Sequence, residues 1–431
     1  MERIVFKIEK SQEGLYLPLE IEVDDVEKLG ITYSYARHLE IVGGDAVYET
    51  EQAVIDFSII GPNGQFLGSS GSNRGYLFFS ERESSVGFEK LKQMAGVWTI
   101  LVGAYNIPDE GIEVVYEFDT VEKAYRWFKG DTHMHTTASD GQLRGSTLVE
   151  VAKDMGLDFI MMTDHNNYHP EAGFVSDEYL TVIPGVEWTQ YNGHGNFLNV
   201  EGPLAPSFVT TTEEELRAMI QKGKDAGALF VLNHPFCPNV PWKWTKELDY
   251  DAIEVWNGGT DPRANVAAIE WWHGELLKGR RVVALGGSDF HRFDQIHSLG
   301  SPTVHVYAKS KSRRDILEAI QLGALYITNN VEEVGLEMVS SDGVGMGGVA
   351  GAGESLTLTF RGLKKGFHVK IIDDVRVKDI FVEQDMKEFR VKEALSGRRF
   401  VRVEVWDERG YVSVVGMEGM LLLVSNPVYV G

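Results

Sequence analysis

The stretch Gly130-Asp131-Thr132-His133-Met134-His135-Thr136-Thr137-Ala138-Ser139-Asp140-Gly141 decides the fold that we expect. It follows an apolar, aromatic run at residues 125–128 and precedes a helix-like segment, which is typical of the end of a buried strand. Side chains alternate between the two faces of a strand, so His133 and His135 project the same way. Imidazole is the commonest protein ligand for transition metals. The stretch therefore predicts a metal site, to which Asp140 can fold back from a polar loop.

The length and charge of the chain limit its class. With 431 residues it exceeds one ordinary core, and its hydrophobic content of 43% is ample for roughly two to four packed domains. The net charge of −23 argues against electrostatic binding of nucleic acid or of an anionic membrane, because both require a basic surface. We therefore expect no extended nucleic-acid binding and no membrane partner.

Cysteine usage and hydropathy suggest the compartment. Cys237 is the one cysteine, so the chain forms no internal disulfide and contains no cysteine-rich zinc module. The sequence shows no signal-peptide pattern and no run near the ~18 apolar residues of a membrane span. We expect a soluble, cytoplasmic protein.

The two ends of the chain read as β-rich. Apolar residues alternate with polar ones at 17–23 and again at 401–405, as they do in half-buried strands. Several short strands with turns between them are typical of a sandwich. We expect β-sandwich-like domains at residues 1–126 and 331–431.

Strand and helix signals alternate between residues 127 and 330. The capping box Thr212-x-x-Glu215 predicts a helix to about Ala226, and further helices are expected at 263–279 and 313–322. This order predicts parallel strands with right-handed crossovers, hence an α/β sheet or barrel with functional residues at the carboxyl ends of its strands. The strand-like runs end at His135, His165, Glu187, His234, Asn257 and Asp289.

Ten of the twelve histidines lie between residues 133 and 305. Any one of them is more often a hydrogen-bonded core or surface residue than a ligand, but burying several imidazoles with carboxylates is costly without a cation. One ion uses about four or five ligands, so the nine candidate ligands of this region fit two or three divalent ions of zinc, manganese or iron. The flanking glycines of one member, His194, would let the backbone approach an ion. The candidate ligands are His133, His135, Asp140, His165, Glu187, His194, His234, Asp289 and His291.

The ordered motifs of this region resemble those of the PHP (polymerase and histidinol phosphatase) domain. The His-Gly-Asn segment at 194–196, the Trp-Asn segment at 256–257 and the flanking β domains resemble the carbaryl-hydrolase-like subfamily. The resemblance covers roughly residues 127 to 330. The motifs are His133-x-His135 with Asp140-Gly141, Thr163-Asp164-His165, Pro184-Gly185-x-Glu187, Asn233-His234-Pro235 and Gly287-Ser288-Asp289-x-His291.

The resemblance implies a distorted (β/α)7 barrel with a trinuclear metal centre at its C-terminal mouth. In this assignment Glu187 bridges the first two ions. The first ion is held by His133, His135, Glu187 and Asp289, the second by Glu187, His194 and His234, and the third by Asp140, His165 and His291.

The expected activity is that of a metal-dependent phosphoesterase. A metal-activated hydroxide at a di- or trinuclear centre would hydrolyse a small organic phosphate or nucleotide, and a third ion suits phosphoryl transfer. Asp164 would orient neighbouring ligands, while Arg144 and Arg292 are candidates to grip a phosphate. For Arg292 a salt bridge is an equal alternative. Two other readings stay open: a metal-dependent carboxyl or carbamate ester hydrolase, and a carbohydrate- or protein-binding module with an inert barrel.

Two further patterns have simpler explanations. The run Gly343-x-Gly345-x-x-Gly348 matches a dinucleotide fingerprint by its letters, but it lacks a following helix, so we expect a flexible loop. The basic run at residues 309–314 is expected to be a solvated face.

Overall fold

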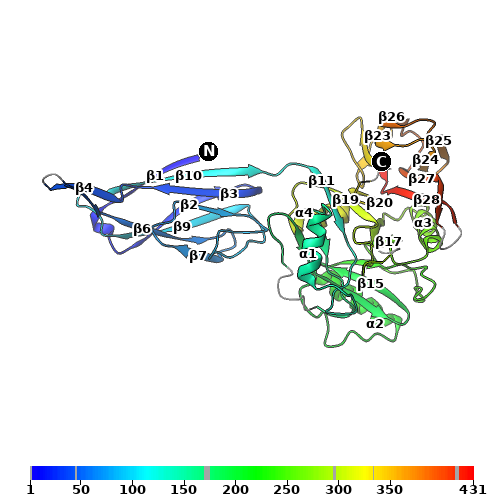
Figure 1. Cartoon of the computed structure of the whole chain (residues 1–431), viewed down its shortest axis with the longest axis horizontal. Coiled ribbons are helices and arrows are strands. Elements are labelled where there is room, and N and C mark those ends of the chain that lie inside the picture. Colours follow the sequence, from blue (N-terminus) through cyan, green and yellow to red (C-terminus); the bar gives the residue numbers. More distant parts are fainter. Residues whose placement is uncertain (1, 44–45, 169–174, 295–297, 333, 413–416) are drawn as a thin grey trace. The chain divides into compact units, whose positions relative to one another are not determined.

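The computed structural model describes residues 2–43, 46–168, 175–294, 298–332, 334–412 and 417–431. The described residues form a mixed α/β structure that is rich in strands and contains four α-helices (Figure 1). The chain divides into two compact units, Met1–Ala124 and Tyr125–Gly431. The expected boundary near residue 330 lies inside the second unit, and the division into three domains stays a prediction. None of the described helices has the length and apolar character that crossing a membrane requires.

The first unit consists of antiparallel sheets that share one core. Strand orders are β1-β10-β3-β8 and β2-β9-β6-β7, with β4 and β5 as a separate pair. In β2, Leu19, Ile21 and Val23 are buried while Glu20 and Glu22 are exposed, so the predicted alternation is confirmed. The elements are β1 (Glu2–Ile8), the 3-10 helix η1 (Lys10–Gln12), β2 (Tyr16–Val23), β3 (Val26–Ser34), β4 (His38–Gly43), β5 (Ala46–Glu51), β6 (Val54–Ile60), β7 (Phe66–Ser70), β8 (Tyr76–Phe79), β9 (Gly96–Tyr105) and β10 (Ile112–Glu122).

The second unit begins with the predicted alternation of strand and helix. The capping box at Thr212 and Glu215 is present, and Gly323 ends α4 with a φ of 81°. The elements of this part are β11 (Arg126–Asp131), α1 (Gly145–Asp154), β12 (Phe159–Met161), β13 (Thr181–Ile183), β14 (Gly185–Gln190), β15 (Gly193–Leu198), α2 (Glu213–Asp225), β16 (Leu229–Leu232), β17 (Ala252–Asn257), α3 (Pro262–Leu277), β18 (Val283–Gly287), β19 (Thr303–Ala308), α4 (Arg313–Leu322) and β20 (Leu325–Thr328).

Strand pairing in this part is only partly parallel. β11, β12 and β13 pair in parallel, as do β16, β17 and β18. β14 and β15, however, form an antiparallel hairpin, and β15 also runs antiparallel to β16. The expectation of parallel crossovers throughout is therefore wrong here, because the two residues between β14 and β15 are too few for a crossover.

Two isolated bridges extend the pairing beyond the ends of the strands. Met134 pairs in parallel with Phe290, and His165 pairs in parallel with Glu187. The first bridge joins the segments that follow β11 and β18, and the second joins the segment that follows β12 to β14. The carboxyl ends of strands that lie far apart in the sequence therefore meet at one edge.

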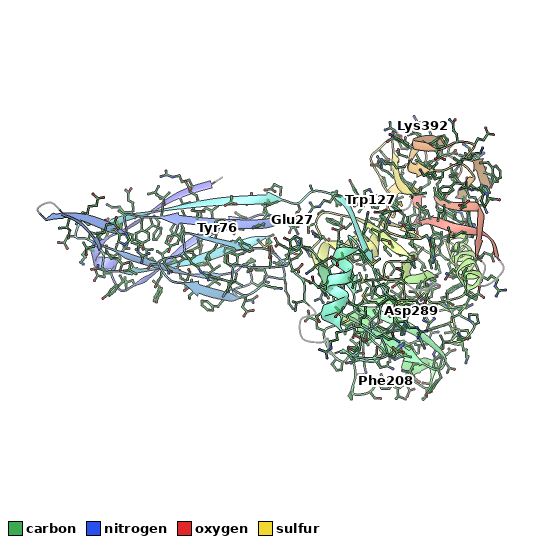
Figure 2. The ribbon with its side chains drawn as sticks, in the orientation of Figure 1. Glu27, Tyr76, Trp127, Phe208, Asp289 and Lys392 are labelled. Atoms are coloured by element: carbon green, nitrogen blue, oxygen red, sulfur yellow. The ribbon has the colours of Figure 1, made fainter. Side chains whose placement is uncertain are left out.

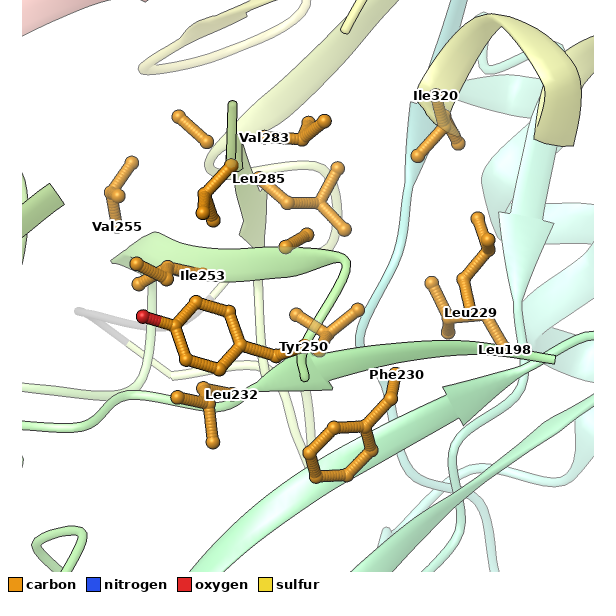
Figure 3. Close-up of a cluster of buried hydrophobic side chains, with 14 of the residues drawn as sticks. Leu198, Leu229, Phe230, Leu232, Tyr250, Ile253, Val255, Val283, Leu285 and Ile320 are labelled. Carbon is orange, nitrogen blue, oxygen red and sulfur yellow. The ribbon is translucent and has the colours of Figure 1, made fainter. Parts of the chain in front are cut away.

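Apolar side chains fill the space behind this edge. Figure 3 shows Phe230 and Leu232 of β16, Ile253 of β17 and Leu285 of β18 within one buried cluster, to which α4 contributes Ile320. These side chains are almost fully removed from water, which stabilises the strands by about 1.5–3 kcal/mol for each large side chain.

The last quarter of the chain is β-rich and joins the α/β part. β28 pairs with β20, so the main sheet continues into β27, β24 and β25. The buried Asn426 side chain accepts from the backbone N–H of Ala284 (2.9 Å) and donates to the Ala284 carbonyl (2.8 Å). The strands are β21 (Gly335–Ser340), β22 (Val349–Ala350), β23 (Ser355–Leu363), β24 (Phe367–Asp373), β25 (Val377–Phe381), β26 (Met386–Ala394), β27 (Phe400–Val412), β28 (Met417–Ser425) and β29 (Val428–Val430).

His305 in β19 is a buried neutral imidazole. Its ring stacks on Tyr326 with centroids 4.5 Å apart, and its Nε2 lies 2.8 Å from Thr328 Oγ1. The Thr328 hydroxyl donates to the Asn330 carbonyl, so His305 must donate to Thr328. Burial lowers the pKa of His305 from its ordinary 6.5 to about 3.

We predict that His305 makes the stability of this unit depend on pH. Between about pH 6.5 and 3 the unfolded state binds a proton that the folded state does not, so stability falls as the pH falls through this window. His305→Gln keeps a donor for Thr328 but does not titrate. Urea unfolding should show that the parent loses about 2 kcal/mol more than the variant between pH 7.5 and 5.0. An equal loss in both proteins would contradict the assignment.

Candidate metal centre

His133 and His135 lie just beyond the end of β11, with their rings on the same side. The ring centroids are 5.3 Å apart, whereas Met134 between them points into an apolar cluster with Phe290. Their backbone is fixed by the segment after β18, because His135 N–H donates to the Phe290 carbonyl and Asp289 N–H donates to the His133 carbonyl. This pairing places Asp289 beside both imidazoles.

Glu187 in β14 is the hub of the site. Its side chain is fully buried, and five imidazoles lie around its carboxylate, including that of His135, whose Nε2 is 3.6 Å from Oε2. Oε1 is 3.4 Å from His133 Nε2, 3.2 Å from His194 Nδ1 and 3.4 Å from His234 Nε2, while Oε2 is 2.7 Å from His165 Nδ1. One carboxylate thus faces ligand atoms from several strands, as a bridging ligand would.

Asp140 folds back from the loop after His135. Its Oδ1 lies 3.3 Å from His291 Nε2, 3.6 Å from His165 Nε2 and 3.9 Å from His135 Nδ1. Gly141 is required at this turn, since a Cβ there would approach the His135 carbonyl oxygen to 2.3 Å. The carboxylate of Asp140 is more than half exposed, so this group forms the outer part of the site.

The nine predicted ligands therefore lie within one cluster, although their grouping differs from the assignment that the resemblance implies. His135 also belongs to the group of Asp140, His165 and His291, and His165 stands with Glu187 and His194. The groups overlap at His135, His165 and Glu187. The assignment of each residue to a particular ion stays a prediction.

The donor set fits divalent metal ions. Metal–nitrogen and metal–oxygen bonds of about 2.0–2.2 Å leave neighbouring ligand atoms about 3.0–3.6 Å apart. Asp289 Oδ1 lies 3.0 Å from His135 Nε2 and 3.4 Å from His133 Nε2, within that range. Several ligand atoms are buried without a hydrogen-bond partner, which is costly unless a cation binds them. Among the described residues these atoms include His133 Nε2, His135 Nδ1 and His234 Nδ1.

The electrostatics of the cluster also call for positive charge. Burial by itself would raise the pKa of Glu187 and of Asp289, but the His133 ring nearby holds both well below their usual range. Conversely, burial would lower the pKa of His133, and Asp289, Glu254 and Glu187 together raise it well above its usual range. The site therefore has a strongly negative potential that a cation stabilises.

Two ligand residues have strained backbones. His234 has a φ of +25° and Asp289 a φ of +52°, in the left-handed region that residues with a Cβ rarely adopt. Such conformations cost on the order of 1–3 kcal/mol each and are held by their surroundings. The His234 N–H donates to Glu254 Oε2 (2.9 Å), which fixes one of these turns.

Glu254 is a residue that the sequence reasoning missed. It is buried in β17, where it accepts from His133 Nδ1 (2.8 Å), from the His234 N–H and from Asn257 Nδ2 (2.9 Å). The contact with His133 Nδ1 leaves Nε2 of that ring free to face Glu187 and Asp289. The signal was available, because a glutamate within the apolar run at 252–256 needs a buried partner.

Asp164 and the two arginines occupy different surroundings. Asp164 accepts from Thr136 N–H (2.8 Å) and from Ser139 Oγ (2.6 Å), so it holds the loop that joins His135 to Asp140. Arg292 is largely exposed and lies 3.3 Å from Asp294, the salt bridge that was the equal alternative. Arg144 is an exposed residue at the N-cap of α1. Neither arginine is among the described residues that line the cavity at the metal centre.

The cavity at the metal centre has a volume of about 190 Å³. Besides the predicted ligands it is lined by small or uncharged residues, including Cys237, Val240, Asn257 and Thr260, and no lysine or arginine is among its described lining residues. The glycines that flank His194 allow close packing, and the expected approach of their backbone to an ion stays a prediction. A Cβ at position 193 would meet the Trp242 ring at 2.5 Å, and one at position 195 would meet the Phe230 ring at 2.6 Å.

The chain is similar to solved structures of other proteins. No protein-family model and no curated protein matches the chain. It is similar to a two-domain protein from Bacteroides vulgatus that contains a predicted PHP-like metal-dependent phosphoesterase, at 20% identity and a TM-score of 0.41, over 69% of this chain and 95% of that one. It is also similar to a protein from Bifidobacterium adolescentis whose assigned activity, metal-dependent phosphoesterase, is itself a prediction. That likeness has 17% identity and a TM-score of 0.30, over 44% and 96% of the two chains.

We predict that Glu254→Gln weakens metal binding. Three donors converge on the two oxygens of Glu254, and a glutamine would turn an N–H group toward one of them, releasing His133 or His234. Loss of a partner that orients a ligand typically costs 10–100-fold in metal affinity. Elemental analysis after dialysis against a graded metal buffer measures the change. The matched control is Glu270→Gln on the exposed face of α3, and equal metal content in both variants would contradict the role of Glu254.

Proposed function

We propose that this chain is a metal-dependent phosphoesterase that hydrolyses a small organic phosphate or nucleotide. The observation that carries the proposal is a set of three overlapping groups of potential metal ligands. Each pair of groups has one residue in common, which is His135, His165 or Glu187. One ion would use only about four or five of the nine predicted ligands, so the set suits two or three ions. The motifs that resemble the PHP domain support the same reaction class.

The proposal includes the architecture that the resemblance implies. We propose that the strands from β11 to β18 form a distorted (β/α)7 barrel, flanked by sandwich-like domains, and that the chain is related to the carbaryl-hydrolase-like subfamily. The strand pairings support this, since they run from β11 through β12 and β13 and from β14 to β18, with bridges at His165–Glu187 and Met134–Phe290.

The residues of the site have separable tasks. His133, His135, Glu187 and Asp289 would hold one ion, Glu187, His194 and His234 a second, and Asp140, His165 and His291 a third. When bound, divalent ions would polarise the ester and acidify a water molecule.

Hydrogen bonds within and around the site orient these ligands. Asn233 Nδ2 donates to Glu187 Oε1 (2.8 Å), and His291 Nδ1 donates to the Asp289 carbonyl (2.8 Å), which directs His291 Nε2 toward Asp140. Asp164 fixes the loop that carries Asp140 through Thr136 and Ser139. These bonds orient the ligand atoms before an ion or a substrate binds.

One observation favours a second candidate, a carboxyl or carbamate ester hydrolase. The described lining of the cavity contains no lysine or arginine, so no cationic side chain there would compensate a phosphate dianion. An uncharged ester avoids this requirement. Under the first proposal the metals themselves must neutralise the substrate.

We predict that Glu187→Gln loses metal and activity together, because one carboxylate faces ligand atoms of several imidazoles. Metal-replete parent protein should contain at least two ions per chain, and the variant should contain fewer and lose at least about 100-fold in kcat/KM, which corresponds to about 2.7 kcal/mol. Elemental analysis and p-nitrophenyl phosphate hydrolysis measure the two effects. Fewer than two ions in the parent, or near-normal turnover by the variant, would refute the multinuclear site.

The two candidate reactions are distinguished by paired substrates on the same metal-loaded preparation. We expect hydrolysis of p-nitrophenyl phosphate that stops on chelation and returns with zinc, manganese or iron. 1-Naphthyl N-methylcarbamate and p-nitrophenyl acetate serve as the alternatives. Turnover of the carbamate or the acetate alone would replace the first proposal by the second.

A further inference from the structure

A second cavity lies in the same unit, away from the predicted metal ligands. It has a volume of about 640 Å³, which falls within the range of about 300–1,000 Å³ typical of small-molecule sites. Its walls come from the start of β11, the end of β19, α4, β21 and the glycine-rich loop at 343–348. Tyr125 directly precedes β11 and Trp127 lies at its start, whereas His133 and His135 follow its other end. Figure 2 shows Trp127 and Asp289 in separate regions of this unit.

Three aromatic rings form one wall of this cavity. The rings of Tyr125 and Tyr307 stack with centroids 5.3 Å apart, and the Trp127 ring lies 5.1 Å from Tyr307. Tyr125 is 58% exposed and Tyr307 is 40% exposed, although their neighbour Tyr326 is buried. Clustered aromatic surface left open to solvent in this way is characteristic of a ligand site.

The opposite side is apolar and leaves room for a ligand. Met338 and Met346 line it, and methionine adapts readily to the shape of what it contacts. Gly343 has a φ of +85°, and a Cβ added there would meet no atom within 4 Å. The start of the glycine-rich run at 343–348 is therefore open at the edge of this cavity, whereas its end is packed, since a Cβ at Gly348 would meet the Val344 side chain at 2.5 Å.

The charges around the cavity select the kind of ligand. Its described lining contains three carboxylates and a single cationic side chain, Lys309. Asp315 is buried and lies 3.6 Å from Arg314, and Glu337 lies 3.4 Å from Arg361, so both are matched by arginines of the chain and Glu318 is the exposed carboxylate at the rim. The Lys309 ammonium lies 5.9 Å from the centroid of the Tyr125 ring, so the aromatic wall already attracts one cation of the chain itself. Electron-rich ring faces with Glu318 at the rim complement positive charge.

We propose that this cavity binds a small organic cation, in which an ammonium group is carried on an apolar body. The aromatic wall formed by Tyr125, Trp127 and Tyr307 would contact the cationic group, and the side lined by Met338 and Met346 would contact the apolar body. Glu318, which is exposed on α4, would add charge attraction at the rim.

Calorimetric titration of the full-length protein tests the proposal with three probes of similar size. We expect benzyltrimethylammonium to bind at least tenfold more tightly than benzyl alcohol or phenylacetate. Glu318→Gln should weaken the cation several-fold, and Lys309→Met should strengthen it, since a competing cation is removed. Tighter binding of phenylacetate, or equal binding of all three probes, would overturn the assignment.

A matched pair of substitutions locates the binding. Val339→Trp on β21 would fill the cavity and should weaken benzyltrimethylammonium at least tenfold, whereas Val377→Trp on β25 lies outside the cavity lining and should leave it unchanged. Both valines are partly exposed strand residues, and a thermal melt verifies that each variant is folded. Unchanged affinity in Val339→Trp, or reversed effects of Lys309→Met and Glu318→Gln, would exclude this cavity.

Discussion

Buried negative charge is the constraint on which the second unit depends. Glu187 has no exposed surface and Glu254 almost none, and a carboxylate in such surroundings must be matched by donors or by a cation. The strand ends supply that match: the bridges Met134–Phe290 and His165–Glu187 bring imidazoles from distant segments to one edge. The apolar core behind this edge gives the sheet the rigidity that holds them together.

Periodicity and capping made much of the fold predictable. The period of two placed His133 and His135 on one side of the chain, and the capping box at Thr212 together with Gly323 marked the ends of helices that the structure contains. Which strands pair with each other was harder to predict from the sequence. The hairpin of β14 and β15 reverses a direction that strand–helix alternation predicts, because a short connection outweighs the general pattern. The joining of β28 to β20 is a long-range contact that no local pattern encodes.

The sequence predicted which residues cluster at the candidate site, but not how these residues are arranged around one another. Chemistry-bearing side chains at strand ends identified the members of the cluster, because the carboxyl ends of strands meet. Which imidazole faces which carboxylate depends on loop conformations, as the turn that returns Asp140 to His291 illustrates. The glutamate in the apolar run at 252–256 indicated a buried carboxylate that needs a partner, but only the structure shows that this partner is His133, 2.8 Å from Glu254.

The link from Asn426 to Ala284 bears on how the chain folds as it leaves the ribosome. Every strand pair of Met1–Ala124 lies within that unit, so its partners are complete early in translation. The sheet beside the predicted metal ligands is completed later, because β20 lacks its neighbour until β28 has been made and Ala284 lacks its partner until Asn426 follows. Domains that complete their contacts late expose sheet edges for longer, which favours aggregation. Nascent chains stalled before residue 417 should therefore rely more on chaperones than the full-length chain.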